Sequence, residues 1–189
     1  MNNTAFTTTC ERGNTEIARL LVSYGCTINT ANNHGMTALH ISAAMGFVEI
    51  VELLLVNNCE INVCDSFNQT LLCLAIENYQ KPCIELLISH GCDVNIFNLE
   101  KQTPLYIACR KRYVDIVELL LNIDDCDIDK SDNSHESPLS VACVYGCKDI
   151  VERLIQSNCT IDTFNIYGRS PLHIAVCSFN LGVAQILVQ

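Results

Sequence analysis

Cysteine is the residue type in this sequence with the greatest capacity for chemistry. The chain of 189 residues contains 13 cysteines, and thiolates bind zinc, act as nucleophiles or sense redox state. No Cys-x-x-Cys pair occurs, and the closest pairs are Cys59-x4-Cys64 and Cys143-x3-Cys147. Because no second pair follows either of them at ligand spacing, we expect no metal site and no cofactor. A cysteine-rich metal or redox-sensing module remains an alternative interpretation.

Histidine is the second candidate for catalysis, and the chain has five: His34, His40, His90, His135 and His173. Sequence spacing alone does not decide whether a serine or cysteine lies beside one of them. The sequence contains no nucleophile elbow, no phosphate-binding loop and no paired metal-binding motif. We therefore predict that the protein is not an enzyme.

Composition restricts the partners and the compartment. Hydrophobic residues make up 49% of the chain, which is enough to build a core. The formal net charge of −10 disfavours nucleic acids and anionic membranes as partners. The odd number of cysteines cannot pair completely within one chain, and neither a secretory leader nor a membrane-length apolar run is present. We expect an intracellular protein, cytoplasmic or nuclear, with free thiols.

The elements that must position these residues repeat along the chain. The segment Thr-Ala-Leu-His-Ile-Ser at 37–42 recurs in variant form from positions 70, 103, 137 and 170, at steps of 33, 33, 34 and 33 residues. A degraded first copy begins at Thr4. A second block reads Glu-Ile-Val-Glu-Leu-Leu at 49–54, and a third reads Asn-Cys-Glu-Ile-Asn at 58–62, and both recur with the same period. A structural unit of 33 residues is therefore predicted.

Each block predicts one part of that unit. Ser or Thr followed by Pro favours a helix start, and the small and apolar residues after it predict a helix of about two turns. Gly46 stands where this helix should end in the left-handed conformation. Glu49 then opens a second helix with an apolar stripe, and Gly25 and Gly91 mark the end of such helices. An Asn or Asp a few residues later, such as Asn32 or Asp65, suits a tight turn.

Two departures from the pattern stand out. Tyr79, Arg112 and Phe179 replace the glycine that ends the first helix, which leaves the geometry of the turn there unpredicted. The fourth unit also carries one extra residue near Asp124.

This unit, with its period of 33 residues and its Thr-Pro-Leu-His-x-Ala signature, resembles the ankyrin repeat. The resemblance covers essentially the whole chain and implies an all-α fold: a solenoid of stacked helix-turn-helix units with β-hairpin-like fingers, forming a single domain over residues 1–189. The repeats are predicted at about 1–34, 35–67, 68–100, 101–134, 135–167 and 168–189. In the family, fingers and first helices line the concave side and second helices form the convex back. Since packed helices lie about 8–10 Å apart, six units predict a rod of about 50–60 Å.

The resemblance also suggests roles for the reactive residues. Cys26, Cys59, Cys92, Cys126 and Cys159 share one repeat position, and Cys10, Cys109 and Cys143 share another. The family usually has Ala at both positions, so we interpret these thiols as core fillers. His40 and His173 end the signature, where the family's His ties the turn to the helix. Asn29, Asn62 and Asn95 should hydrogen bond within the finger turn, and the family makes them candidates for hydroxylation by an asparaginyl hydroxylase.

Binding residues are expected where the family is variable, at finger tips and at the ends of first helices. Aromatic and arginine side chains are the usual anchors of interfaces. The candidates are Phe67, Phe97, Arg110, Lys111, Arg112, Tyr145, Phe164 and Tyr167. Arg110 to Arg112 form the one dense basic run, which with Lys101 favours an acidic or phosphorylated segment as ligand.

The predicted function is a non-catalytic scaffold that binds a partner protein segment on its concave surface of fingers and inner helices. We expect a monomer that binds neither nucleic acid nor membrane. A substrate-recognition arm of a ubiquitin ligase remains a further alternative. Because the chain stops inside the second helix of the sixth repeat, at Ile186 to Gln189, we expect a fragment of a longer protein.

Overall fold

The computed structural model describes residues 4–188, which form twelve α-helices and no β-strand. The helices are α1 Ala5–Glu11, α2 Thr15–Ser23, α3 Ala38–Met45, α4 Val48–Val56, α5 Leu71–Glu77, α6 Lys81–Ser89, α7 Pro104–Lys111, α8 Val114–Leu121, α9 Pro138–Tyr145, α10 Lys148–Gln156, α11 Pro171–Cys177 and α12 Leu181–Leu187. Each predicted repeat contains one helix pair. Within the described residues, strand-like pairing in the fingers is restricted to one antiparallel bridge between Cys64 and Thr70.

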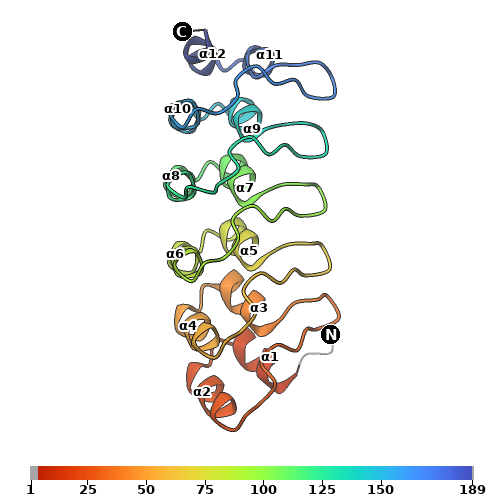
Figure 1. Cartoon of the computed structure of the whole chain (residues 1–189), viewed down its shortest axis with the longest axis vertical. Coiled ribbons are helices and arrows are strands. Elements are labelled where there is room, and N and C mark those ends of the chain that lie inside the picture. Colours follow the sequence, from red (N-terminus) through yellow and green to blue (C-terminus); the bar gives the residue numbers. More distant parts are fainter. Residues whose placement is uncertain (1–3, 189) are drawn as a thin grey trace. The chain divides into compact units, whose positions relative to one another are not determined.

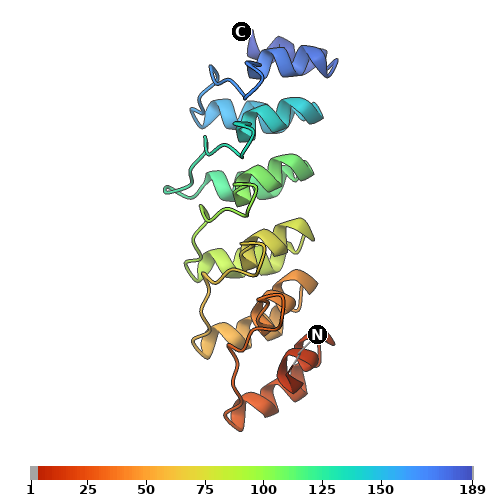
Figure 2. The ribbon, with the colours of Figure 1, turned by 90° about the vertical axis from the view of Figure 1, so that its right-hand side faces the viewer.

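The chain divides into two compact units between Asp93 and Val94. In the first unit, α1, α3 and α5 form an inner row and α2, α4 and α6 an outer row. The second unit repeats this plan, with α7, α9 and α11 inside and α8, α10 and α12 outside (Figure 1). Within each unit the finger loops extend from the inner row, away from the outer helices (Figure 1), and Figure 2 shows the helix pairs lying one above another. The single domain and the rod predicted for the whole chain therefore stay predictions.

Hydroxyl caps start all six inner helices, as the sequence predicts. The hydroxyl of each capping residue accepts a hydrogen bond from the backbone N–H three residues later; the capping residues are Thr4, Thr37, Thr70, Thr103, Ser137 and Ser170. In α3 and α11 the signature histidine returns a bond to the backbone of the capping residue, which completes a capping box.

The turn after the inner helix keeps one geometry whatever residue stands there. Gly46 and Gly146 adopt the left-handed conformation, with φ of 78° and 66°. Tyr79, Arg112 and Phe179 adopt it too, with φ of 54°, 63° and 57°. In each case the next residue donates its N–H to the carbonyl five residues back, for example Tyr113 to Ala108 at 3.1 Å. The stacking of helix pairs therefore imposes the turn even where the side chain disfavours it.

The extra residue of the fourth repeat changes the end of one outer helix. In four repeats the shared cysteine donates its N–H five residues back, as Cys59 does to Leu54. Cys126 donates instead to Ile123, three residues back, and no residue between Arg112 and His135 has a positive φ. The insertion thus replaces the left-handed turn with a wider one.

The core of each unit lies between its two rows of helices. Outer-helix residues at i, i+1 and i+4, such as Ile50, Val51 and Leu54, are completely buried, and so is the corresponding set on α8 and α10. Burying a side chain of this kind stabilises the fold by about 1.5–3 kcal/mol. Small inner-helix residues such as Ala43 and Ala75 are also fully buried, which lets neighbouring inner helices approach closely.

Candidate functional site

The finger tips are built by one side chain per finger. The carboxylate or amide oxygen of the turn residue accepts hydrogen bonds from the N–H groups two and four residues later. These turn residues are Asn32, Asp65, Asn98, Asp132 and Asn165. Backbone bonds also join neighbouring fingers within each unit, from Ser66 to His34, from Asn133 to Glu100 and from Ile166 to Ser134. The tips are therefore held in place before any partner binds.

In the second unit the fingers line an open hollow of about 470 Å³. Three successive fingers contribute its lining residues, which are Lys101, Lys130, Ser131, Asp132, His135, Thr163 and Phe164. The formal charge of this lining is positive, because two lysines outnumber one aspartate. A cationic hollow on a chain of net charge −10 is a local reversal of the molecule's field.

The aspartate in this hollow is already engaged by three donors. Asp132 accepts hydrogen bonds from the backbone N–H groups of Ser134 and Glu136, at 2.8 and 2.9 Å, and from the hydroxyl of Tyr106 at 3.0 Å. Burial, and then the charge of Asp132, raise the pKa of the Tyr106 phenol well above its usual range, while Arg110 acts in the opposite direction. Tyr106 therefore stays protonated and donates to Asp132.

Two of the predicted aromatic anchors face cations. The Lys130 ammonium lies 5.5 Å from the centre of the Phe97 ring, and the Arg169 guanidinium lies 5.9 Å from that of Tyr167. Both distances are within the range of cation–π attraction. Phe97 is half-buried, whereas Tyr167 is 71% exposed.

The structure brings together only part of the predicted site. Phe164, 60% exposed, lines the hollow. Tyr145 is exposed at the end of α9, and Lys111 and Arg112 are exposed at the end of α7. Phe67 is exposed on a finger of the first unit, so nothing places it beside the others.

The same hollow contains residues that sequence reasoning did not single out. These residues are Lys130, His135 and Thr163. The sequence groups Lys101 only with the basic run at Arg110. A signal was present in the sequence. At the fourth position of the finger turn, Gly35 and Gly168 have positive φ, and Lys101 and His135 adopt the same conformation with φ of 62° and 58°.

The side chains of Asn62 and Asn95 bond to the next repeat, whereas the expectation placed their hydrogen bonds within the finger turn. The Asn62 side-chain oxygen accepts the N–H of Asp93 at 2.9 Å, and that of Asn95 accepts the N–H of Asp127 at 2.8 Å. The Asn95 amide also donates to the Asp125 carbonyl at 2.7 Å. These amides bridge successive repeats, because equivalent loops lie side by side in the stack.

The signature histidines have the structural role that the resemblance implies. Nδ1 of His40 lies 2.9 Å from the hydroxyl of Thr37, and that of His173 lies 2.7 Å from Ser170. His40 is completely buried, and burial lowers its pKa to about 4, against the opposing effects of the Asp65 charge and nearby backbone carbonyls. His40 is therefore neutral at physiological pH.

The thiols are predominantly core groups. Cys10, Cys109 and Cys143 are fully buried and Cys159 is 7% exposed. The other four thiols at the shared positions are half-buried, so core filling is only partial there. Burial raises the pKa of Cys10 to about 11 and that of Cys143 to about 12. Between residues 4 and 188, no three His, Cys, Asp or Glu side chains are grouped so that they could hold a metal ion.

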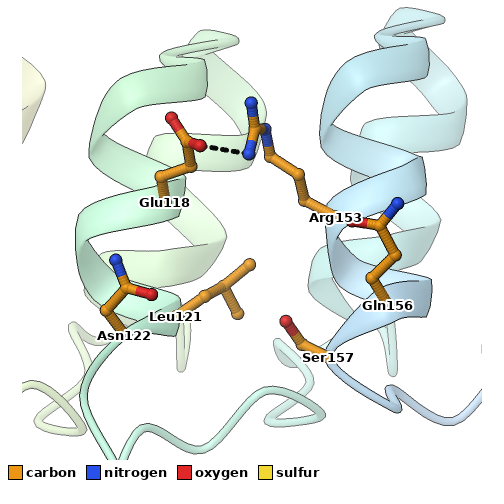
Figure 3. A pocket seen from close by; sticks show the side chains of 6 residues that line it. All are labelled: Glu118, Leu121, Asn122, Arg153, Gln156 and Ser157. Carbon is orange, nitrogen blue, oxygen red and sulfur yellow. Dashed lines mark hydrogen bonds and ion pairs between the residues drawn. The ribbon is translucent and has the colours of Figure 1, made fainter.

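A second hollow of about 190 Å³ lies between outer helices α8 and α10 (Figure 3). Glu118 and Arg153 extend toward one another across it and form an ion pair (Figure 3). Because the two side chains satisfy each other's charge, this hollow is not a cationic site comparable with that at the fingers.

Comparison with known proteins identifies the family. The model of the ankyrin repeats, as three copies, matches residues 1–65, 48–132 and 123–189. The chain therefore belongs to the ankyrin repeat family. No curated protein matches it. None of the helices in residues 4–188 combines the length and the apolarity that crossing a bilayer requires.

Solved structures share the fold at low sequence identity. A human ASB11 ankyrin repeat domain is 22% identical, with a TM-score of 0.84, covering 98% of this chain and 83% of that one. An ankyrin repeat domain from Acinetobacter baumannii AYE is 17% identical, with a TM-score of 0.90, covering 97% and 95%. A chain from the complex of the Bdellovibrio bacteriovorus predatory endopeptidase Bd0816 with the immunity protein Bd3460 is 24% identical, with a TM-score of 0.89, covering 100% and 98%.

Proposed function

We propose that the protein is a non-catalytic interaction domain that binds a partner protein segment on the finger side of its inner helices. The observation that carries the proposal is in the second unit, where Phe164 is 60% exposed and lines the cationic hollow, and Tyr167 on the same finger is 71% exposed against Arg169. Exposed aromatic side chains next to cations are typical anchors of protein interfaces.

The rigidity of the fingers favours this function. Each tip is closed by an Asx turn and bonded to its neighbour, so a partner would not have to order these loops. Binding to such a preformed surface avoids much of the entropic cost of association. The structure of the immunity protein complex is an example of a chain of this fold in an assembly with another protein.

The charge distribution supports an acidic or phosphorylated segment as the ligand. The hollow and the end of α7 gather Lys101, Lys130, Arg110, Lys111 and Arg112 in one unit of an otherwise acidic chain. Charge-assisted hydrogen bonds to carboxylates or phosphates are about twice as strong as neutral ones. We expect the domain to act as a monomer inside the cell.

Charge reversal and ring removal test the proposed surface. A partner is first isolated by affinity capture, and its affinity is then measured for the wild type, for Phe164→Ala and for the double variant Arg110→Glu, Lys111→Glu. Removing a central aromatic anchor should weaken binding by about tenfold or more. Lys148→Glu, on the exposed start of outer helix α10, is the control for a charge reversal away from this surface.

Secondary structure and thermal unfolding of each variant should match the wild type, because Lys111 and Phe164 are exposed and Arg110 is only half-buried. Equal affinities for all variants and the control would show that this surface is not the binding site.

Hydroxylation of Asn29, Asn62 and Asn95 stays a prediction. Intact-mass and peptide mass spectrometry of protein isolated from its native cells checks it, through a gain of one oxygen per modified side chain.

A further inference from the structure

We infer that the hollow between the fingers of the second unit is a receptor for a phosphorylated side chain. The inference rests on the proposed function and specifies its ligand. The sequence indicates the basic run at Arg110 as the anion site, whereas the structure gathers a second set of cations around an open hollow at the fingers.

The two lysines of the hollow carry charges that no ion pair within the described part of the chain compensates. Neither Lys101 nor Lys130 forms an ion pair with any residue of the described range 4–188. The nearest carboxylate in the lining, that of Asp132, already accepts three hydrogen bonds, from two backbone amides and Tyr106. The Asp132 oxygens are therefore occupied by these donors, while the two ammonium groups keep their own donors available.

One polar atom in the wall of the hollow lacks a hydrogen-bond partner among the described residues. Thr163 lines the hollow, and its hydroxyl is buried with no hydrogen-bond partner. A buried hydroxyl without a partner is unfavourable, and most such groups in native structures are satisfied. An anionic oxygen entering the hollow would supply the missing acceptor.

Two residues that line the hollow have a strained backbone. Lys101 and His135 occupy the turn position where two other fingers have glycine, and both adopt a left-handed φ. This conformation is costly for a residue with a Cβ, and such residues cluster at functional sites. Glycine would make the same turn at lower cost, so the retained side chains fit a role in binding.

The dimensions favour a phosphorylated side chain over a bare ion. The open hollow measures about 470 Å³, which is more than a phosphate ion occupies. The exposed ring of Phe164 forms part of the wall and offers an apolar contact to the stem that carries the phosphoryl group. The cation over Phe97 holds the Lys130 stem in a defined direction.

Titration with small anions tests the site without knowledge of the partner. Isotopically labelled protein is titrated with phenyl phosphate, inorganic phosphate and benzoate, and backbone amide shifts are followed by NMR. We expect saturable shifts at Ser131, Thr163 and Phe164, with phenyl phosphate binding tighter than both other anions. Benzoate binding as tightly as phenyl phosphate would overturn the assignment to phosphate, and the absence of saturable shifts would overturn the site.

Variants identify the groups responsible. Lys130→Met keeps most of the stem and removes the charge. Lys101→Asn removes the charge and shortens the side chain, with a residue that tolerates a left-handed φ. Each should weaken phenyl phosphate binding at least about fivefold, since each removes a charge-assisted contact. Lys148→Met changes the net charge equally but lies outside the hollow, and it should leave the affinity unchanged. Equal weakening by all three variants would mean non-specific attraction and would contradict the inference.

A final arm separates this inference from the proposed function. Capped peptides that carry phosphotyrosine or phosphothreonine should bind more tightly than phenyl phosphate, if the ligand is a protein segment rather than a small phosphate ester. Partner binding that depends on Phe164 but persists after phosphatase treatment would sustain the interaction domain and remove the phosphate receptor.

Discussion

At the scale of single residues, burial decides which of the chemically capable groups can react. His40 and His173 occupy the same motif position and make the same capping contacts. His40 is enclosed by neighbouring elements, so its charged form carries a large desolvation cost, whereas His173 is exposed. Two histidines at the same motif position therefore differ in burial, and burial decides how protonation of His40 affects the stability of the fold.

The stability of the protein should fall in mildly acidic solution because of His40. The unfolded chain protonates this imidazole near pH 6.5, and the folded chain near pH 4. Below pH 6.5 the unfolded state therefore binds a proton that the folded state does not. The free energy of unfolding falls progressively between pH 6.5 and pH 4, by about 3 kcal/mol in total. Urea unfolding at pH 7 and pH 4.5 measures it.

The comparison is made with His40→Gln, which should lose less stability than the wild type over the same pH interval. His173→Gln removes an exposed histidine of the same motif and should keep the wild-type pH dependence. Identical pH profiles for the wild type and His40→Gln would contradict the prediction.

Thiol reactivity should follow exposure. Wherever the pKa of a cysteine is displaced it is displaced upward by burial, as in Cys73 and Cys83, both to about 11, so few thiolates exist at neutral pH. Cys177 is exposed. Pulse alkylation with iodoacetamide, read by mass spectrometry, should label Cys177 first and the buried thiols only on unfolding. Rapid labelling of several cysteines in the native protein would instead revive the redox-sensing alternative.

At the scale of elements, the helix pair is a unit whose turn is set by backbone hydrogen bonds. The capping hydroxyls and the finger carboxylates act within four residues, so the sequence predicts them directly. The left-handed turns at Tyr79, Arg112 and Phe179 were not predictable in this way. They depend on packing between helices, which outweighs the local preference of the residue.

Relieving one of these turns should stabilise the protein. Arg112 is exposed with φ of 63°, and Arg112→Gly removes the cost of a Cβ in the left-handed region while adding freedom to the unfolded chain. The net gain should be about 0.5–1 kcal/mol in the free energy of unfolding. Chemical denaturation measures it.

The matched control at the equivalent position is Gly146→Ala, which should destabilise the protein by more than about 1 kcal/mol. Its Cβ would overlap the Asn180 side chain, which bonds the Cys143 carbonyl. A destabilised Arg112→Gly would show that the arginine makes a stabilising contact that exceeds the strain.

At the scale of the whole molecule, the repeat period predicts an extended stack. Six units at about 10 Å each give a rod about 50–60 Å long. A compact protein of this size has a radius of gyration of about 16 Å, and a rod of the same mass has a larger one. Small-angle X-ray scattering should give a radius clearly above that value and the mass of a monomer. A compact, spherical envelope would contradict both the extended shape and the single continuous array.

The sequence alone determined the helix pairs, their caps and the finger turns, because these depend on hydrogen bonds and φ preferences that act over a few residues and recur with each repeat. It also indicated Phe164 as a binding residue from its place in a variable finger. Only the tertiary structure decided that Lys101, His135 and Thr163 meet Phe164 around one hollow, and that Asn62 and Asn95 bridge repeats. Contacts between residues about thirty positions apart arise from the stacking of neighbouring units, and neither the period nor the composition specifies which side chains then touch.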